Sequence, residues 1–582
     1  MTRVLQALRV GNFKAFADTQ RIPLKPITLI FGPNSAGKSS FIHSLAMAHE
    51  AQFGREKRSL ARLDVHHTDV GGSSIDLGGF RQYVHRGQLN KRVEWGCEVK
   101  VAALAESKDQ RLAQLLASAA SVTLNLAWGV MLDDGDRPLP GAEPRLESIE
   151  IIADDIEIVR MSQRPVKWSE LPYVYGSEVK KFRIDRLASD HPIFRQVLKA
   201  IVETQTTSEE MHPDDYDGAN DAISALLPEL LVRADQFFPS SVELPKSDGS
   251  NVSPVGMLFP VSKGNRKEDI AQAVRFVLPR TLNDLIKGLG DAIADELKQL
   301  QYLGPLRSFP PRHLAFAEHE DTNWYAGGGY AWDVVRRDDS VREAVNRWLG
   351  SSKLKTPYKL VVRALVAADQ LKEPLATGLD QIAADDEAMF LGSMDSDGLV
   401  TQHWPPRDDA RPFFQDTEVS AERLVKAVAA ADIERIRELV LLDQRTNTVV
   451  THRDVGTGIS QVLPVLVMAY GSSGKLLAME QPEIHLHPAL QAELGDVFIE
   501  AALGERQNTF ILETHSEHLI LRLMRRIREG RISPDDIGVV FVEPLARGSR
   551  FEELRIDEEG DFIDEWPGGF FEESFNEKFA GR

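Results

Sequence analysis

The sequence has almost no cysteine, and this scarcity excludes two classes of protein. Cys97 is the single cysteine among 582 residues. A disulfide framework is therefore excluded, and so is any zinc or iron–sulfur site built on cysteine ligands. The same scarcity is expected of a protein that works in a reducing cytoplasm.

Long apolar runs and an excess of positive charge are also missing. No apolar run approaches the roughly 20 residues that cross a bilayer, and the opening MTRVLQALRVGNF is too short and too mixed for a signal peptide. We therefore expect a cytoplasmic protein with no membrane partner. The formal net charge of −20 does not suit a general nucleic-acid coat, so a DNA contact would have to be local. One basic strip is RLMRRIREGR over 522–531, for which a solvated helix face is the favoured alternative.

What the chain does contain is a phosphate loop, within the stretch ITLIFGPNSAGKSS over residues 27–40. An apolar run typical of a buried parallel strand comes first, and apolar residues at helical spacing follow the loop. Strand, loop and helix together form the context that separates the motif G-x-x-x-x-G-K-[ST] from a chance glycine turn. The predicted ATP-binding residues are Gly32, Pro33, Asn34, Ser35, Ala36, Gly37, Lys38, Ser39 and Ser40.

The residue types of this loop explain its chemistry. Gly32 and Gly37 allow the backbone to point successive N–H groups at phosphate oxygens. The helix that starts near Lys38 adds its positive N-terminal end. Lys38 can reach the β- and γ-phosphates, and the hydroxyl of Ser39 can bind Mg²⁺.

A second buried strand is expected to supply the carboxylate that such a loop needs. The apolar run LLAM over 476–479 ends in Glu480, which we predict to be the Mg²⁺ carboxylate; the alternative is an ordinary charged strand end. Gln481 takes the place of the glutamate that would polarise water, and an amide is a poor base. Hydrolysis is therefore expected to be slow, or Glu483 supplies the base.

Two further motifs follow the same logic. His515 comes after the strand TFILE, at the edge where an open α/β sheet binds ligands, and can donate to the γ-phosphate or to the attacking water. A surface histidine with its hydrogen bonds satisfied is the alternative.

A glycine signature precedes a long apolar run and would open another helix: Gly456, Thr457, Gly458 and Ser460. One chain needs only one such anion site, so we expect this signature to act across a dimer, unless it is a simple helix cap. His485 and His487 are more typical of a turn or subunit contact than of a metal site.

The remaining chain predicts an α/β protein of several parts. Residues 1–90 and 440–582 would form the nucleotide-binding head, 91–187 an antiparallel β subdomain, and 188–439 a helical, loop-rich insertion. Within the insertion we expect a long amphipathic stretch over 270–300, a polar loop over 375–415 and helices over 421–440. No sustained heptad repeat occurs, so a long coiled-coil arm is not expected.

The order of these motifs resembles that of ABC-type ATPase heads such as SMC, RecF and RecN. EQPEIHLHP, DVGTGISQVLPV and ETHS look like the ATPases of the overcoming-lysogenization-defect (OLD) group, and YLGPLR with WPGGFF narrows the resemblance to bacterial AAA ATPases of phage-defence operons. The Septu and PARIS system ATPases are of this general kind. The resemblance covers roughly 1–90 and 440–582 plus the YLGPLR loop.

The resemblance implies an ABC-type α/β head that binds ATP with Mg²⁺ and works as a homodimer or higher oligomer. It implies Lys38 and Ser39 for the phosphates and Mg²⁺, Glu480 for Mg²⁺, His515 as the switch histidine, and the signature in trans. Residues 516–582 are too few for a Toprim nuclease, so damage in a defence role would need a separate nuclease or toxin-like effector from the same operon. The alternatives are a nucleotide-gated scaffold with little turnover and a RecF-like DNA repair ATPase.

Overall fold

The computed structural model describes most of the chain and assembles its two ends around one sheet. The described residues are 3–54, 63–106, 110–133, 135–140, 142–163, 181–205, 213–243, 266–307, 323–350, 353–392, 417–433, 436–450 and 457–567. Among them, six strands form a sheet in the order β13-β17-β18-β3-β19-β20, parallel except for the last pair. Their bounds are β3 Ile27–Phe31, β13 Leu300–Leu303, β17 Leu476–Glu480, β18 Thr509–Glu513, β19 Ile537–Leu545 and β20 Gly548–Leu554.

Strand β3 lies at the centre of this sheet, and this position explains why its sequence is apolar throughout. All five of its residues are buried. Ile27, Leu29 and Phe31 pack into the core on one face of the sheet, whereas Ile30 packs into the core on the other face. A parallel strand covered on both faces needs such a continuous apolar run, as the sequence predicted.

A second, antiparallel sheet lies beside the first. Nine described strands take the order β12-β11-β10-β9-β8-β7-β6-β1-β2. Their bounds are β1 Leu5–Gly11, β2 Gln20–Pro23, β6 Val93–Lys100, β7 Ser121–Gly129, β8 Arg145–Ala153, β9 Ile156–Gln163, β10 Lys181–Leu187, β11 Leu231–Arg233 and β12 Ser241–Glu243. The antiparallel sheet therefore extends beyond residues 91–187 at both ends, because β1 and β2 from the start of the chain join it.

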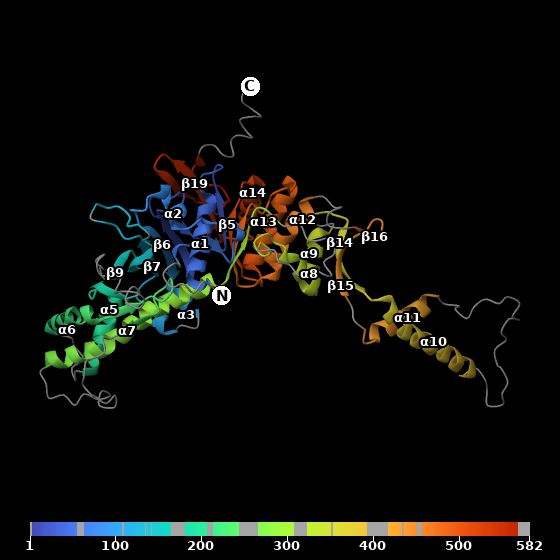
Figure 1. Ribbon diagram of the computed structural model, residues 1–582, viewed down its shortest axis with the longest axis horizontal. Coiled ribbons are helices and arrows are strands. Elements are labelled where there is room, and N and C mark those ends of the chain that lie inside the picture. The colour runs from blue at the N-terminus through green and yellow to red at the C-terminus, as the bar shows by residue number, and fades with distance from the viewer. Residues whose placement is uncertain are drawn as a thin grey trace, which may run out of the picture.

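Helices cover both faces of the parallel sheet. Helix α1 (Lys38–Phe53) packs into the core shared with the antiparallel sheet, and α12, α13 and α14 pack on the opposite face; Figure 1 shows these three grouped together. The other bounds are α2 Phe80–Tyr83, α3 Val101–Glu106, α4 Gln110–Leu115, α5 Pro192–Gln205, α6 Pro213–Leu226, α7 Arg266–Leu297, α8 Tyr330–Arg337, α9 Asp339–Leu349, α10 Lys372–Gly392, α11 Thr417–Ala430, α12 Thr457–Gly471, α13 Pro488–Leu503 and α14 Glu517–Arg528.

The insertion contains an arm that the sequence did not predict. Helices α10 and α11 project away from the rest of the molecule, joined to it through β14 (Tyr358–Leu365) and β15 (Ile436–Asp443) (Figure 1). The polar loop expected over 375–415 is wrong up to residue 392, where α10 ends. The helix expected over 421–440 ends at 430, because 436–443 pairs along its whole length with β14, and β16 (Thr448–Val450) extends that sheet. A short hairpin, β4 (His67–Thr68) and β5 (Gly72–Asp76), forms a separate two-stranded sheet.

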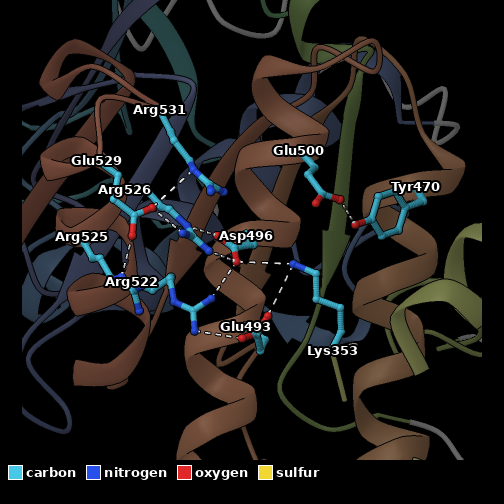
Figure 2. A network of polar contacts seen from close by, with 10 residues as sticks. All are labelled: Lys353, Tyr470, Glu493, Asp496, Glu500, Arg522, Arg525, Arg526, Glu529 and Arg531. Carbon is cyan, nitrogen blue, oxygen red and sulfur yellow. Dashed lines mark hydrogen bonds and ion pairs between the residues drawn. The ribbon is translucent and has the colours of Figure 1, made fainter. Parts of the chain in front are cut away.

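The basic strip over 522–531 is a solvated face only in part, because Arg525, Arg528 and Arg531 are exposed whereas Arg522 and Arg526 are largely buried. Arg522 and Arg526 both bind the carboxylate of Asp496 on the neighbouring helix α13, at 2.7 and 2.6 Å (Figure 2). The two guanidinium side chains are only 13% and 12% exposed. Lys353, which precedes β14, lies 3.5 Å from the same carboxylate and joins the network from outside the helix pair. The arginines thus hold α14 to α13, and Lys353 ties the insertion to the same carboxylate.

Candidate functional site

The phosphate loop adopts a backbone that explains its glycines. Gly32 has φ 146° and Gly37 has φ 97°, both in the region that favours glycine, and Ser35 has φ 62°. A Cβ at Gly32 would lie 2.7 Å from the carbonyl oxygen of Val542, and a Cβ at Gly37 would lie 2.2 Å from the Cβ of Ala15. Neither position therefore tolerates a side chain without a local rearrangement.

Lys38 lies buried at the start of α1 beneath an exposed loop crest. Its ammonium donates hydrogen bonds to the carbonyl oxygens of Gly32 and Pro33, both at 3.0 Å, and the residue is 4% exposed. Burial lowers the pKa of Lys38, and nearby glutamates oppose this shift. Residues 33–35 at the crest are exposed. A phosphate entering over the crest would meet a cation already fixed by the loop.

The acidic strand ends come together beside this loop. Strand β18 lies between β3 and β17, and Glu513 pairs in register with Glu480 on one side and with Ile30 on the other. After β18 the chain crosses β3 to form β19, so β3, which leads into the phosphate loop, lies between two strands that follow one another in the chain. Open α/β sheets bind their ligands beyond the carboxyl ends of their parallel strands.

Glu513, which the sequence analysis did not select, is the acid that contacts the loop. The hydroxyl of Ser39 donates to Oε2 of Glu513 at 2.6 Å. Burial, together with the charge of Glu480, raises the pKa of Glu513 to about 7, while Ser39 and Lys38 act in the opposite direction. Nearly neutral pH is thus needed to ionise this carboxyl in the folded chain.

Glu480 is buried and faces a different set of partners. The hydroxyl of Tyr302 donates to its Oε1 at 3.0 Å, and Nε2 of His43 lies 3.3 Å from the same oxygen. The ammonium of Lys14 lies 2.6 Å from Nδ1 of His43. Lys14 has only protons to donate, so Nδ1 accepts and Nε2–H donates to Glu480. Burial lowers the pKa of His43, which keeps its ring neutral and this relay of hydrogen bonds intact.

Glu483, His515 and Gln481 surround the same strand ends. Oε1 of Glu483 accepts from the backbone N–H of His515 at 2.8 Å, and burial raises the pKa of this carboxyl. Burial lowers the pKa of His515, and the charge of Lys38 lowers it further. Oε2 of Glu483 and Nε2 of His515 are buried atoms with no hydrogen-bond partner among the described residues. Gln481 has φ 47° and donates its N–H to the carbonyl of Glu513 at 2.7 Å.

The described part of the glycine signature lies next to the turn that follows β17. A Cβ at Gly458 would lie 3.2 Å from the carbonyl oxygen of His485, and Ser460 is buried in α12. Gly456 and the side chain of Thr457 lie outside the described part of the structure. His487 accepts from the N–H of Ala489 and caps α13, which is a turn role rather than a metal site.

The donor set suits a magnesium ion that is bound largely by phosphate and water. No cluster of three or more His, Cys, Asp or Glu side chains able to hold a metal occurs within the described ranges. Mg²⁺ in nucleotide sites typically takes one or two protein oxygens and completes its octahedron with phosphate and water. The hydroxyl of Ser39 beside buried carboxylates fits that requirement.

Four residues that contact this site were missed as site residues by the sequence analysis: Lys14, His43, Tyr302 and Glu513. Two signals could have found them. Glu513 ends an apolar strand in the same way as Glu480, and Tyr302 opens the motif YLGPLR. Lys14 and His43 offer no such signal, because only the folded chain brings them to Glu480.

Family comparisons place ATPase models on both halves of the chain. A model described as an AAA domain matches residues 7–201, and one described as an AAA domain, putative AbiEii toxin, Type IV TA system, matches residues 286–522. A model described as a protein of unknown function, DUF3696, matches residues 532–580. No curated protein is significantly similar to the chain.

Solved structures give only distant likenesses. The SmcHead bound to the C-winged helix domain of ScpA is 9% identical, with 95% of this chain and 98% of that chain covered and a TM-score of 0.32. The SMC head domain from Thermotoga maritima is 8% identical, with 95% and 100% covered and a TM-score of 0.31. Likenesses at this level support no conclusion about function.

Topology and motifs together define the class. A phosphate loop leads from β3 into α1, an acid ends β17 two strands away, and Thr-His-Ser follows the intervening strand. The fold is an α/β fold with a phosphate loop on its parallel sheet and an antiparallel sheet beside it, as predicted. Models of AAA domains match two parts of this chain. Among the described residues, no helix combines the length and apolar character that a bilayer crossing requires.

Proposed function

We propose that this chain binds ATP with Mg²⁺ and hydrolyses it slowly. One observation carries the proposal: Lys38 and Ser39, at the start of α1, meet Glu480, Glu483 and Glu513 at the carboxyl edge of the parallel sheet. Ser39 and Glu513 are already in hydrogen-bond contact at 2.6 Å although 474 positions separate them. Such a convergence of phosphate loop and buried acids is what phosphoryl transfer requires.

Each residue then has a defined role. The loop amides and Lys38 would hold the β- and γ-phosphates, and Ser39 with Glu480 would hold Mg²⁺, with Glu513 beside them. A bound Mg²⁺ would neutralise charge on the phosphate oxygens as the bond to the γ-phosphate breaks. His515, whose Nε2 has no partner among the described residues, would donate to the γ-phosphate. Its lowered pKa keeps the ring neutral, with one N–H to give.

Gln481 supports the slow rate. Its amide can orient water but accepts a proton poorly. Glu483 and Glu513 are the acids from which a base would come, because both are buried next to Lys38 and His515. Their raised pKa values bring them closer to the range in which a carboxylate accepts a proton effectively.

The experiment is phosphate release from Mg-ATP by the wild type and four variants. Lys38→Ala and Glu513→Gln should each lower the rate by at least about 100-fold, as expected for lost transition-state contacts, and Gln481→Glu should raise it. Lys475→Ala is the matched control, because this lysine lies at the opposite end of the sheet with its ammonium 2.6 Å from Gln299. Release that persists in Lys38→Ala would refute hydrolysis at this site. A rate unchanged in Gln481→Glu would refute only the idea that Gln481 limits it.

The biological role that we propose is gating of a separate effector, as part of antiviral defence. The family model described as a putative AbiEii toxin domain, together with the motifs of phage-defence ATPases, supports it.

We propose that two heads associate so that the signature of one, around Gly458 and Ser460, reaches the nucleotide of the other. A nucleotide-gated scaffold with little turnover is the second candidate, favoured by Gln481. Co-purification with operon neighbours, with and without ATP, tests partner and assembly together.

A further inference from the structure

The motif YLGPLR, over residues 302–307, is not explained by the roles assigned so far. It begins within β13 (Leu300–Leu303), the edge strand of the parallel sheet, and comes from the middle of the chain. Its first and last residues, Tyr302 and Arg307, are 3% and 6% exposed although both are polar. Buried polar groups need partners, so their contacts indicate what the motif does.

Tyr302 contacts the acid that ends the neighbouring strand. Its hydroxyl donates to Oε1 of Glu480 at 3.0 Å. Gly304, two residues later, leaves room for this contact, because a Cβ there would lie 3.2 Å from the hydroxyl oxygen of Tyr302 and 3.0 Å from Oγ of Ser74. The motif therefore orients the side chain of Glu480.

Arg307 joins two separate segments of the chain, one in α12 and one directly after β17. Nη2 donates to the carbonyl oxygen of Gln481 at 2.9 Å, and Nη1 donates to the carbonyl oxygen of Gln461 on α12 at 2.7 Å. Pro464 lies inside α12 and lacks the N–H that would bond the carbonyl of residue 460, which is next to the carbonyl that Arg307 binds. Gln481 is held in a left-handed conformation, φ 47°, with its carbonyl turned to the guanidinium.

We propose that Tyr302 and Arg307 form a positioning clamp, which fixes the acidic end of β17 and transmits its state to helix α12. The inference rests on the proposed function, because the end of β17 matters only if it serves a nucleotide. Tyr302 holds the side chain of Glu480, and Arg307 holds the backbone one residue later. The same guanidinium holds the first turns of α12, directly after the glycine signature.

The geometry favours a coupling between α12 and the end of β17 over simple packing. The buried guanidinium of Arg307 contacts two backbone carbonyls and has no carboxylate partner in direct contact among the described residues. The cost of burying its charge is therefore offset only while both carbonyls stay in place. Movement of Gln481 would break one bond and leave part of the charge without a partner. Helix α12 and the end of β17 are therefore expected to move together. A lysine at 307 has one ammonium and cannot bridge the two carbonyls in the same fork geometry.

The test uses the full chain with Arg307→Lys and Tyr302→Phe, and the probe is Mg-ATP. Amide hydrogen exchange is followed over 457–465 and 481–486, ATP affinity is measured by titration, and kcat by phosphate release. Arg528→Lys is the control for the arginine, because its guanidinium pairs with Asp561 on the exposed surface. Tyr470→Phe is the control for the tyrosine, because its hydroxyl binds Glu500 away from the site (Figure 2).

In the wild type, Mg-ATP should slow exchange in both segments. In Arg307→Lys we expect ATP affinity within about threefold of the wild type, no ATP-dependent slowing over 457–465, and kcat lower by about 10- to 100-fold, as for other residues that orient functional groups. Tyr302→Phe should lower kcat with ATP affinity retained, and the two controls should change neither quantity. An ATP response of α12 that persists in Arg307→Lys would overturn the clamp.

The outcomes separate the clamp from the proposed function. If the wild type binds ATP without hydrolysing it, hydrolysis is refuted and the exchange measurement alone decides the clamp. If the wild type does not bind ATP, both are refuted. If Arg307→Lys does not fold, Tyr302→Phe decides, and a kcat equal to that of Tyr470→Phe would overturn the clamp.

Discussion

The electrostatic environment of Glu513 disfavours its ionised form, which a nearby cation would stabilise. It is buried next to Glu480, and this raises its pKa to about 7. Two carboxylates in a shared, poorly solvated site cannot both ionise easily unless positive charge arrives. Lys38 supplies one charge and a divalent ion would supply two more. The site therefore combines a fixed cation, a hydroxyl and acids, which Mg²⁺ and phosphate would complete in the proposed function.

His49 provides a pH-dependent contribution to stability outside this site. Burial lowers its pKa to about 4, its Nδ1 has no hydrogen-bond partner among the described residues, and its ring lies 5.0 Å from that of Phe53. The unfolded chain binds this proton near pH 6.5 and the folded chain only near pH 4. Stability from this residue is therefore present above pH 6.5 and is lost as the pH falls toward 4.

We predict that His49→Phe reduces the loss of stability between pH 6.5 and 4. The difference, on the order of 1–3 kcal/mol at pH 4, follows from the shift in pKa. Urea unfolding of both proteins at a series of pH values measures it. Between pH 7 and 8 the two free energies should differ by a constant, which serves as the internal control. Parallel curves across the whole range would contradict a neutral, buried His49.

At the scale of elements, the helix pair α13–α14 depends on one carboxylate. Asp496 is 6% exposed and binds Arg522, Arg526 and Lys353 (Figure 2). Loss of this carboxylate would leave the largely buried arginines only partly compensated, by Glu493 and Glu529. This pair packs directly on the strands that carry Glu480 and Glu513, so its loss would also loosen the site.

We predict that Asp496→Asn lowers the free energy of unfolding by about 3 kcal/mol, the lower end of the cost of breaking a buried ion pair, because Glu493 and Glu529 still compensate the arginines in part. Asp291→Asn is the control, because Asp291 pairs with Lys287 on an exposed face of α7 and such pairs contribute less than about 1 kcal/mol. Chemical denaturation measures both variants. Equal stability of the two variants would mean that the network contributes nothing beyond a surface ion pair.

The elements that the sequence predicted well are those with a strong local pattern. The sequence pattern of the stretch 27–40 predicts its strand, loop and helix, and short apolar runs predict the strands that end at Glu480 and Glu513 just as well. The first part of strand β15, residues 436–440, was predicted as helix because IRELV has no helical breaker and its partner β14 is far away in the chain. The contact between Ser39 and Glu513 could not be predicted, since it depends on which strand lies beside β3 rather than on any local spacing.

At the scale of the whole molecule, the parallel sheet collects strands from across the chain. Its neighbours in order come from residues 300–303, 476–480, 509–513, 27–31, 537–545 and 548–554. Strand β13 comes from within 188–439, so the middle of the chain contributes to the head as well as to the projecting arm. The division into head, β subdomain and insertion stays a prediction. What the topology does explain is how Tyr302 and Arg307 reach the nucleotide site.

The central claim is that these distant segments form one Mg-ATP site, and equilibrium binding of ATP tests it most directly. We predict one ATP bound per chain in the presence of Mg²⁺, weaker binding when EDTA removes the metal, and at least about tenfold weaker binding in Lys38→Ala, a loss of roughly 1.4 kcal/mol. Lys475→Ala should bind as the wild type does. An affinity unchanged in Lys38→Ala, or no ATP bound by the wild type, would contradict the account.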